Sequence, residues 1–437
     1  MMELKLNSEF IIRYRIDELG VIFAILATVM YVLIGIYHTG YFKKDKYKKA
    51  YYVFYVISYL GMLSQFFADN LITMYISFEL ISFSTGMLVF HDRNKASEKG
   101  GFRILYFSIA GAFTALFGVF ALYANKGADI PFVKGGSLGN GFLNENKTLF
   151  LVCAFLMIIG FGVKAAILPY HAWLPEAHPV APAPGSALLS GVVVKCGAFA
   201  VIRTVFYVFG AGFIMDTWVQ TVWMALSITS ILLGSMLAYR EKVFKKRLAY
   251  STVSQMNYIM FGLSLLNEAG VMGSLIHVIM HAMVKTALFL AAGNIIHQTG
   301  KKHVDELDGL WKRMPVTFCC YTIAGITLVG IPPAGTFLSK WYLSSGALEF
   351  SGAVSRLAFA GMIVIMISAL LTAGYLFPVS IKGYFGKCQY EENEQGKCEP
   401  GASMTVPLII LILFILVLAV YPNMIFDELA SFAAALM

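Results

Sequence analysis

The sequence predicts an all-α polytopic membrane protein, and two observations carry that prediction. The 437 residues are 58% hydrophobic and only 13% charged, and their mean hydropathy is +0.72, whereas soluble domains are about 45–50% apolar and about 25% charged. Apolar runs of about 20 residues, the length that crosses a bilayer, recur along the chain. We expect no separate soluble domain, and the N-terminal segment lacks the pattern of a cleaved signal peptide.

Hydropathy predicts about twelve transmembrane helices in a single transmembrane domain over residues 1–437. The expected spans are about 19–38, 51–69, 71–90, 103–124, 148–168, 184–209, 217–238, 249–266, 270–297, 315–348, 357–380 and 404–424. Only Asp69 and Asn70 separate the second span from the third, so these two helices are predicted to form a hairpin. The sequence IPPAG interrupts the tenth span at residues 331–335.

Basic residues predict the orientation of these spans. Alternate loops hold 21 lysines and arginines, in the segments 43–49, 93–103, 240–247, 301–313 and 382–397, whereas the opposite loops hold Lys126, Lys134, Lys147 and Arg356. By the positive-inside rule the basic loops are cytoplasmic, and twelve spans then put both termini outside the plasma membrane. The net charge of +8 is therefore a fringe that faces anionic lipid, and we expect no nucleic-acid partner.

Two loops are long enough to need an interpretation of their own. The outer loop at about 125–147 is rich in glycine and asparagine, which predicts a flexible connector. The inner loop at 383–402 is polar, and it is either a docking surface or, more simply, a solvated linker.

The stretch from Gly160 to Cys196 contains the least ordinary chemistry. Lys164 and Lys195 each sit among apolar residues with no acidic neighbour in sequence. Between them lie Pro175, Pro179, Pro182 and Pro184, which predict a non-helical run. Cations buried beside a broken helix are costly in a membrane, and they usually mark an ion or substrate site.

The interrupted helix has an echo later in the chain. Lys164 lies beside the break GVKAAILP, and Lys340 lies beside the break IPPAG, five spans further on. Because five is odd, the two copies run through the membrane in opposite directions. This pattern predicts an inverted repeat, with a first copy at about 51–209, a second at about 217–380 and a terminal helix at about 404–424.

Ionisable residues inside the predicted spans are few. They are Glu79, Lys164, Lys195, Arg203, His277, His281, Lys285 and Lys340. A charge at the bilayer centre costs at least ~2.5–3.5 kcal/mol, so these side chains should face the protein interior. Glu79 is either a carboxyl satisfied by a neighbouring helix or the charge partner of Lys164, and such a pair titrates as a unit. Gly191 and Gly197 leave room for another helix to approach Lys195.

His277, His281 and Lys285 are spaced four apart and share one helix face. The spacing is that of a zinc-protease helix, but HVIMH lacks the glutamate base, so a proton-relay stripe is the better interpretation and a structural polar stripe is the alternative. Arg203 is predicted to reach the outer headgroups. Lys340, followed by Trp341, is either a buried group or an interfacial lysine.

No metal or cofactor site is predicted in this chain. His171, Glu176 and His178 lie in the proline run without an obvious third and fourth ligand, and we interpret them as lining or gating groups. Cys388 and Cys398 share a loop, but no CxxC pair exists, so neither a metal site nor a disulfide is expected there. The sequence has no visible flavin, haem or iron–sulfur motif.

Five motifs together resemble those of a known family. They are the segments 69–82 (DNLITMYISFELIS), 161–203 (FGVKAAILPYHAWLP to VVVKCGAFAVIR), 245–259 (KKRLAYSTVSQMNYI), 277–295 (HVIMHAMVKTALFLAAGNI) and 328–341 (LVGIPPAGTFLSKW). They are similar, in the same order, to motifs of the antiporter-like proton-translocating membrane subunits of respiratory complex I, energy-converting membrane hydrogenases and Mrp-type antiporters. The resemblance covers most of residues 15–385.

The resemblance implies two inverted five-helix repeats, each with a broken helix, and it implies roles for the buried residues. Glu79 and Lys164 match the family's glutamate–lysine pair, and Lys195 matches the central lysine. The segment holding His277, His281 and Lys285 matches the relay to the second half, and Lys340 matches the terminal lysine. Members usually have fourteen helices, so we expect this chain to lack the first two, and its fourth span has no acidic residue.

The resemblance also implies partners. The protein is expected to translocate protons or sodium within a redox-driven complex, without catalysing a reaction itself. Its partners would be other membrane subunits and a peripheral redox arm carrying iron–sulfur clusters, with NiFe, flavin or quinone as further cofactors there. The alternatives are a subunit of a Mrp-type antiporter driven by ion gradients, and a non-pumping scaffold or a subunit coupled to another substrate such as inorganic carbon. An interior poor in carboxylates and rich in lysine favours protons over sodium.

Overall fold

The computed structural model describes residues 2–5, 11–127, 129–387 and 396–437, and nearly all of them are helical. A short antiparallel sheet pairs β1 (Met2–Lys5) with β2 (Ile11–Tyr14). The helices of the first half are α1 (Glu18–Tyr41), α2 (Lys48–Phe66), α3 (Leu71–Val89), α4 (Lys95–Lys126), α5 (Asn140–Glu145), α6 (Lys147–Gly162), α7 (Trp173–Val180), α8 (Ala183–Leu188), α9 (Val194–Ile202) and α10 (Ala211–Ile214).

The helices of the second half are α11 (Trp218–Arg240), α12 (Phe244–Ser264), α13 (Glu268–Thr299), α14 (Pro315–Val329), α15 (Gly335–Glu349), α16 (Ser355–Phe385), α17 (Ala402–Val420) and α18 (Asn423–Leu436). Two π-helical segments, η3 (Leu189–Val193) and η4 (Arg203–Phe209), continue α8 and α9 into one long element. Short 3-10 turns are η1 (Phe90–Asp92), η2 (Tyr170–Ala172), η5 (Val304–Glu306) and η6 (Leu310–Lys312).

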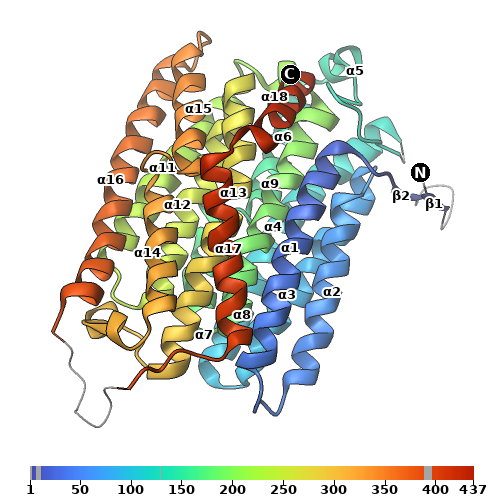
Figure 1. Cartoon of the computed structure of the whole chain (residues 1–437). Helices are drawn as coiled ribbons and strands as arrows, with labels where there is room; N and C mark the ends of the chain where they lie inside the picture. The colour runs from blue at the N-terminus through green and yellow to red at the C-terminus, as the bar shows by residue number, and fades with distance from the viewer. Residues whose placement is uncertain (1, 6–10, 128, 388–395) are drawn as a thin grey trace.

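The long helices run side by side along one direction, and both chain ends lie at the same end of the bundle (Figure 1). We call this end the termini face. The helices alternate in direction, so the basic segments 43–49, 93–103, 240–247, 301–313 and 382–387 lie at the opposite end, which we call the basic face. The strand-like pairing of Val243 with His303 joins two of these segments there.

Polar side chains define where several helices start. Asn70 caps α3 by accepting from the Thr73 amide, and Asn267 caps α13 in the same way. Since Asn70 begins α3 only four residues after α2 ends at Phe66, the predicted hairpin of these two helices is confirmed. At the other end of α13, Gly300 adopts a left-handed conformation, which closes the helix.

Eight helical elements among the described residues are long and apolar enough to cross a membrane. They are α1, α3 with η1, α4, the element from α8 to η4, α11, α13, α16 and α17. Two further apolar helices, α6 and α14, have 16 and 15 residues because each stops at an interruption. The protein is therefore a multi-pass membrane protein with fewer spans by this criterion than the twelve expected.

The centre of the bundle differs in character from its periphery. Every residue in the most apolar stretch of the α8–η4 element is buried, as are 94% of that stretch in α13, whereas only 28% of it is buried in α16. Helix α12 begins FKKRLAYSTVSQ and is too polar to stand out by hydropathy, yet nearly all of it is buried. A helix that touches other helices and not lipid needs no apolar surface, so α12 can carry polar side chains to the centre.

The two predicted interruptions are observed, and the proline run that follows the first is partly helical. Helix α6 stops at Gly162 and α14 stops at Val329, and residues 330–334 separate α14 from α15. The prediction that the run from Pro175 onward is non-helical was wrong, because Trp173–Val180 forms α7. Pro175 lies in the first turn, where backbone amides have no intrahelical acceptor, so it does not disrupt this short helix.

The outer loop at 125–147 is not the flexible connector that its glycines predicted. Ile130, Phe132, Leu138 and Leu143 are buried, and residues 140–145 form α5. Backbone amides of residues 133–138 donate to carbonyls of residues 206–208 in η4. The buried apolar residues are spaced irregularly among polar ones, so local composition hid the packing.

Candidate functional site

A direct contact between Lys195 and His281 lies at the centre of the bundle. Lys195 on α9 is 1% exposed, and its Nζ lies 2.8 Å from Nδ1 of His281 on α13. The same Nζ donates to the Ser190 carbonyl at 2.7 Å, a group left accessible by the π-helical segment η3. The contact joins the element that holds the proline run to the histidine-bearing helix of the second half.

The contact series continues from His281 toward the interrupted helix of the second half. The His281 and His277 rings stack with centroids 5.8 Å apart and planes 18° from parallel. His277 Nδ1 lies 2.8 Å from Ser339 Oγ on α15, the residue before Lys340. Lys195, His281, His277 and Ser339 thus form consecutive neighbours across three elements.

Lys340 binds the end of the preceding half-helix. Its Nζ donates to the carbonyls of Val329 at 2.6 Å and Leu328 at 3.0 Å, which are the last residues of α14. These carbonyls lack intrahelical donors and form the negative end of the helix dipole, which favours a cation. Lys340 is 8% exposed, so it is a buried group and not an interfacial lysine.

Lys285 lies one turn beyond His281, toward the basic face. Its Nζ donates to the Leu248 carbonyl at 2.9 Å and makes a short contact with Ser251 Oγ on the polar helix α12. Lys285 is fully buried. His277, His281 and Lys285 share one face of α13, as predicted, but each contacts a different element.

Lys164 lies in the turn after α6 and is 2% exposed. Its Nζ donates to Ser82 Oγ on α3 at 2.7 Å and lies 4.6 Å from the centre of the Phe78 ring. Within the described chain Glu79 and Lys164 make no direct ion pair, although their charges attract each other at longer range. A buried oxygen of Glu79 has no hydrogen-bond partner among the described residues. The pairing of Glu79 with Lys164 therefore stays a prediction.

The two glycines beside Lys195 stand where other elements approach most closely. A side chain at Gly191 would collide with the Thr286 hydroxyl on α13. A Cβ at Gly197 would lie 2.6 Å from the Ala165 amide and 3.0 Å from the Lys164 Cβ. The predicted close approach is confirmed, and Gly197 brings the turn that holds Lys164 against the helix that holds Lys195.

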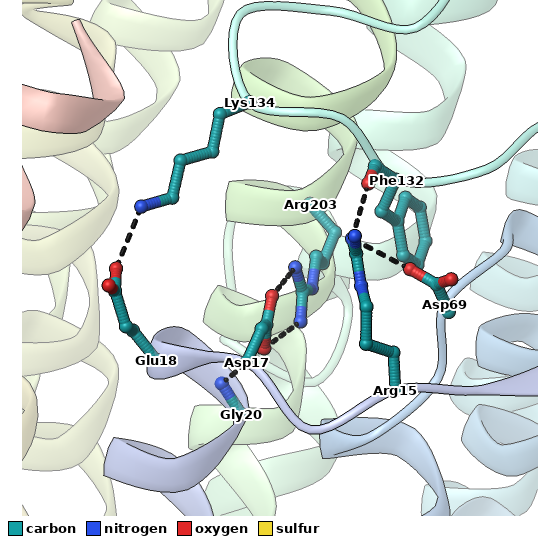
Figure 2. Close-up of polar contacts among 8 residues, drawn as sticks. All are labelled: Arg15, Asp17, Glu18, Gly20, Asp69, Phe132, Lys134 and Arg203. Carbon is teal, nitrogen blue, oxygen red and sulfur yellow. Dashed lines mark hydrogen bonds and ion pairs between the residues drawn. The ribbon is translucent and has the colours of Figure 1, made fainter. Parts of the chain in front are cut away.

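Arg203 does not reach the outer headgroups as predicted. It is 1% exposed, and its two terminal nitrogens donate to the two carboxylate oxygens of Asp17 at 2.6 and 2.7 Å, as Figure 2 shows. Asp17 also caps α1 by accepting from the Gly20 amide at 2.9 Å. Burial raises the pKa of Asp17, but the hydrogen bonds and charge of Arg203 more than offset it, so the pKa lies below its usual value.

Other basic residues at the termini face are also paired. Arg15 contacts Asp69 and the Phe132 carbonyl at 2.8 and 2.7 Å, and Lys134 contacts Glu18 at 2.7 Å (Figure 2). Burial raises the pKa of Asp69, and the charge of Arg15 offsets only part of that effect. These pairs fasten the N-terminal segment and the 125–147 loop to η4.

The candidate gating residues of the proline run lie apart from one another. Glu176 pairs with Arg103 of α4 at 3.0 Å in a partly exposed position. His178 is fully buried, stacks on Phe289 with centroids 4.5 Å apart, and has no hydrogen-bond partner for either ring nitrogen within the described residues. The part of the chain that the structure covers contains no group of three metal-ligating side chains. Cys388 lies outside the described residues.

Sequence reasoning missed the hydroxyl groups that hold these cations. Ser82 lies one turn after Glu79 in the segment FELIS, and Ser339 directly precedes Lys340, so helical spacing was a usable signal for both. Ser251 lies in a polar helix that hydropathy treated as one more span. Asp17 is 186 residues from Arg203, and no local pattern links them.

Fold and site together define a multi-pass membrane protein with a series of buried lysines and histidines through its centre. The chain belongs to the family described as NADH:quinone oxidoreductase/Mrp antiporter, transmembrane, whose profile matches residues 68–377.

Three relatives come from different complexes. An NADH-quinone oxidoreductase subunit N from Desulforudis audaxviator is 31% identical over 88% of this chain and 76% of its own length. A large Na(+)/H(+) antiporter component from Alkalihalophilus pseudofirmus is 32% identical over 93% of this chain. Hydrogenase-4 component B from Escherichia coli is 32% identical over 85% of this chain. The chain spans only 52% and 56% of the length of the last two.

Two solved structures share the fold. A chain of the membrane-bound sulfane sulfur reductase, an archaeal respiratory membrane complex, superposes with a TM-score of 0.86 at 23% identity, covering 97% of this chain and 83% of that chain. A chain of the Mrp complex from Dietzia sp. DQ12-45-1b gives a TM-score of 0.82 at 20% identity, covering 98% and 85%.

Proposed function

We propose that this protein translocates ions, protons in preference to sodium, as an antiporter-like membrane subunit of a larger redox-driven complex. The observation that carries the proposal is the 2.8 Å contact between Lys195 and His281, because it joins the buried cations of the two halves. A lysine and a histidine at hydrogen-bond distance can share and pass a proton. Buried cations of this number have no role in packing that apolar residues would not fill better.

Lys164 and Glu79 form the switch of the first half in this proposal. Lys164 contacts Ser82, which lies one turn from Glu79 on the same helix, and a buried Glu79 oxygen has no partner in the described chain. The lysine therefore has two acceptors within one turn. Partner chemistry that moves it between them would change its hold on a proton and the repulsion it exerts on Lys195.

The second half provides branches toward both faces. From His281, one branch runs to Lys285 and the hydroxyl of Ser251 on the side of the basic face. The other runs through His277 and Ser339 to Lys340, which binds the end of α14. We infer that ions enter and leave the series by these branches.

We also infer twelve membrane crossings arranged as two inverted repeats, with the basic face in the cytoplasm. Matching element lengths support the repeats, since α4 and α13 both have 32 residues and the interrupted helices α6 and α14 have 16 and 15. The excess of basic residues at one face supports the orientation.

The complex to which the protein belongs decides between two forms of the function. Relatives named as components of an NADH-quinone oxidoreductase and a hydrogenase favour a redox-driven complex whose other subunits hold iron–sulfur clusters and NiFe, flavin or quinone. The relative named as part of a Na(+)/H(+) antiporter favours an assembly driven by ion gradients. Purifying the native complex and identifying its subunits by mass spectrometry separates the two, and a non-pumping scaffold would show no ion movement in either.

The translocation itself is tested with Lys164→Ala in the purified complex reconstituted into liposomes. We expect assembly to be retained and ion movement, followed with a pH-sensitive dye, to fall by roughly 10²-fold or more. Lys246→Ala, at a partly exposed ion pair on the basic face, is the matched control and should not change the rate. An unchanged rate in the Lys164 variant refutes the proposal.

A further inference from the structure

A stripe of side chains able to form hydrogen bonds runs along the face of α2 that meets α1. Its members are Tyr51, Tyr55, Ser58, Met62 and Gln65. Their spacing of four and three residues puts them on one side of the helix, and all are buried. At the far end Gln65 donates to the Cys196 carbonyl at 3.0 Å. The stripe therefore leads from the basic face to the helix that holds Lys195, and none of its members belongs to the series described above.

His38 of α1 lies against this stripe in a cage of aromatic rings. Its ring centroid is 4.4 Å from Tyr55, 5.0 Å from Tyr51, 5.7 Å from Tyr52 and 5.8 Å from Phe42. His38 is 0% exposed, and neither ring nitrogen has a hydrogen-bond partner in the described chain. The Tyr51 hydroxyl is likewise without a partner among the described residues.

Packing alone does not account for a histidine at this position. Each buried polar atom left without a hydrogen bond costs about 1–3 kcal/mol. A phenylalanine would fill the same cage, keep the ring contacts and leave no polar atom unsatisfied. Buried polar groups that persist without a protein partner point to bound water or to a chemical task.

The cage connects to solvent at the basic face through a second histidine. His91 of η1 has a side chain only 3% exposed, and its Nε2 lies 3.1 Å from a carboxylate oxygen of Asp45, whose side chain is 29% exposed. The His91 ring lies 5.1 Å from the Tyr51 ring and 4.8 Å from the Phe42 ring. A carboxylate in contact with solvent and with an imidazole can collect protons at a surface.

At its inner end the cage meets groups that approach Lys195. The Tyr55 hydroxyl donates to the Tyr31 carbonyl at 2.5 Å, and the Tyr31 hydroxyl lies 2.8 Å from Ser58 Oγ. Tyr31 lies within the electrostatic range of Cys196, the residue next to Lys195 in the chain. Polar atoms thus follow one another from the basic face to the level of the central lysine.

We propose that His38 is a proton-relay residue of a separate uptake route, which leads from Asp45 and His91 past Tyr51 and His38 to Lys195. The route rests on the proposed function, because it supplies protons to the series that function uses. Asp45 and His91 take a proton from solvent, His38 accepts it on one ring nitrogen and releases the ring proton from the other, and the imidazole is neutral again after each transfer. Water bridges the gaps between these groups.

The test replaces His38 with phenylalanine in the whole complex and measures both proton translocation in liposomes and thermal unfolding in detergent. We expect His38→Phe to slow translocation at least about tenfold and to leave the unfolding temperature unchanged or raised. Tyr37→Phe is the matched control, because it removes a buried hydroxyl of the same helix that bonds the Leu290 carbonyl instead. That control should translocate at the normal rate.

A structural role for His38 would give the reverse result, a lower unfolding temperature with normal translocation, and would overturn the proposal. If His38→Phe does not assemble, Tyr51→Phe decides, since it removes only an unpartnered hydroxyl; a slowed rate supports the route and a normal rate overturns it. Lys164→Ala separates the two levels of inference. A complex in which Lys164→Ala abolishes translocation while His38→Phe is normal retains the proposed function and loses only the route.

Discussion

Removing the Asp17 carboxylate should destabilise the protein strongly, because it leaves a buried guanidinium without its counter-charge. Arg203 is 1% exposed, and both of its terminal nitrogens bond Asp17, at 2.6 and 2.7 Å. Removing one partner of such a pair costs about 3–5 kcal/mol. The rings of Phe132 and Tyr207 lie 5.2 and 4.4 Å from the guanidinium and offset only part of that.

The assay compares unfolding of wild type, Asp17→Asn and Asp17→Asn/Arg203→Met in detergent. We expect a large loss in the single variant and a partial recovery in the double variant, whose buried charge is gone. Glu18→Gln is the control, because the Glu18–Lys134 pair is 68% and 39% exposed and such pairs contribute about 0–1 kcal/mol. A loss in Asp17→Asn no greater than in Glu18→Gln refutes the reasoning.

The same pair predicts a pH dependence of stability. The pKa of Asp17 is lower in the folded protein than in the unfolded chain. Its stabilisation is therefore fully present above the unfolded pKa of about 3.9 and is lost as the pH falls through the lower folded value. The difference between wild type and Asp17→Asn should be constant from neutral pH to about pH 5 and shrink below about pH 4. A difference that shrinks between pH 8 and pH 6 contradicts the assignment.

Two further substitutions test the packing and the second half. Gly191→Val should lower stability by about 1–3 kcal/mol in detergent unfolding, because the new side chain collides with Thr286, whereas Gly141→Ala, which meets no atom within 4 Å, should not; equal effects would contradict the close approach. Lys340→Met should keep the fold and lower ion translocation by roughly 10²-fold or more, whereas Lys246→Met should leave the rate unchanged. A normal rate in Lys340→Met would exclude that lysine from the path.

Local sequence patterns were sufficient for the fold class and for much of the site. Apolar runs, the Asp69–Asn70 turn and the two interruptions depend on residues within one turn or one span, so composition and spacing predict them. The buried lysines and histidines were predictable because charged side chains in apolar spans have few alternatives to facing the interior.

Tertiary contacts account for what the sequence did not predict. Arg203 was expected at the lipid headgroups because its partner Asp17 is 186 residues away. The 125–147 loop was expected to be flexible because its anchors lie on η4, outside the loop itself. The direct bond of Lys164 goes to Ser82, one turn from the expected Glu79, and that difference depends on rotamers that spacing does not specify.

The central claim is that ions pass from one half of the protein to the other through the contact of Lys195 with His281. Lys195→Met tests it most directly, since methionine fills a similar volume without an ammonium group. We predict that the reconstituted complex assembles with all its subunits and loses ion translocation by roughly 10²-fold or more. Translocation at the wild-type rate in a fully assembled Lys195→Met complex would contradict the claim.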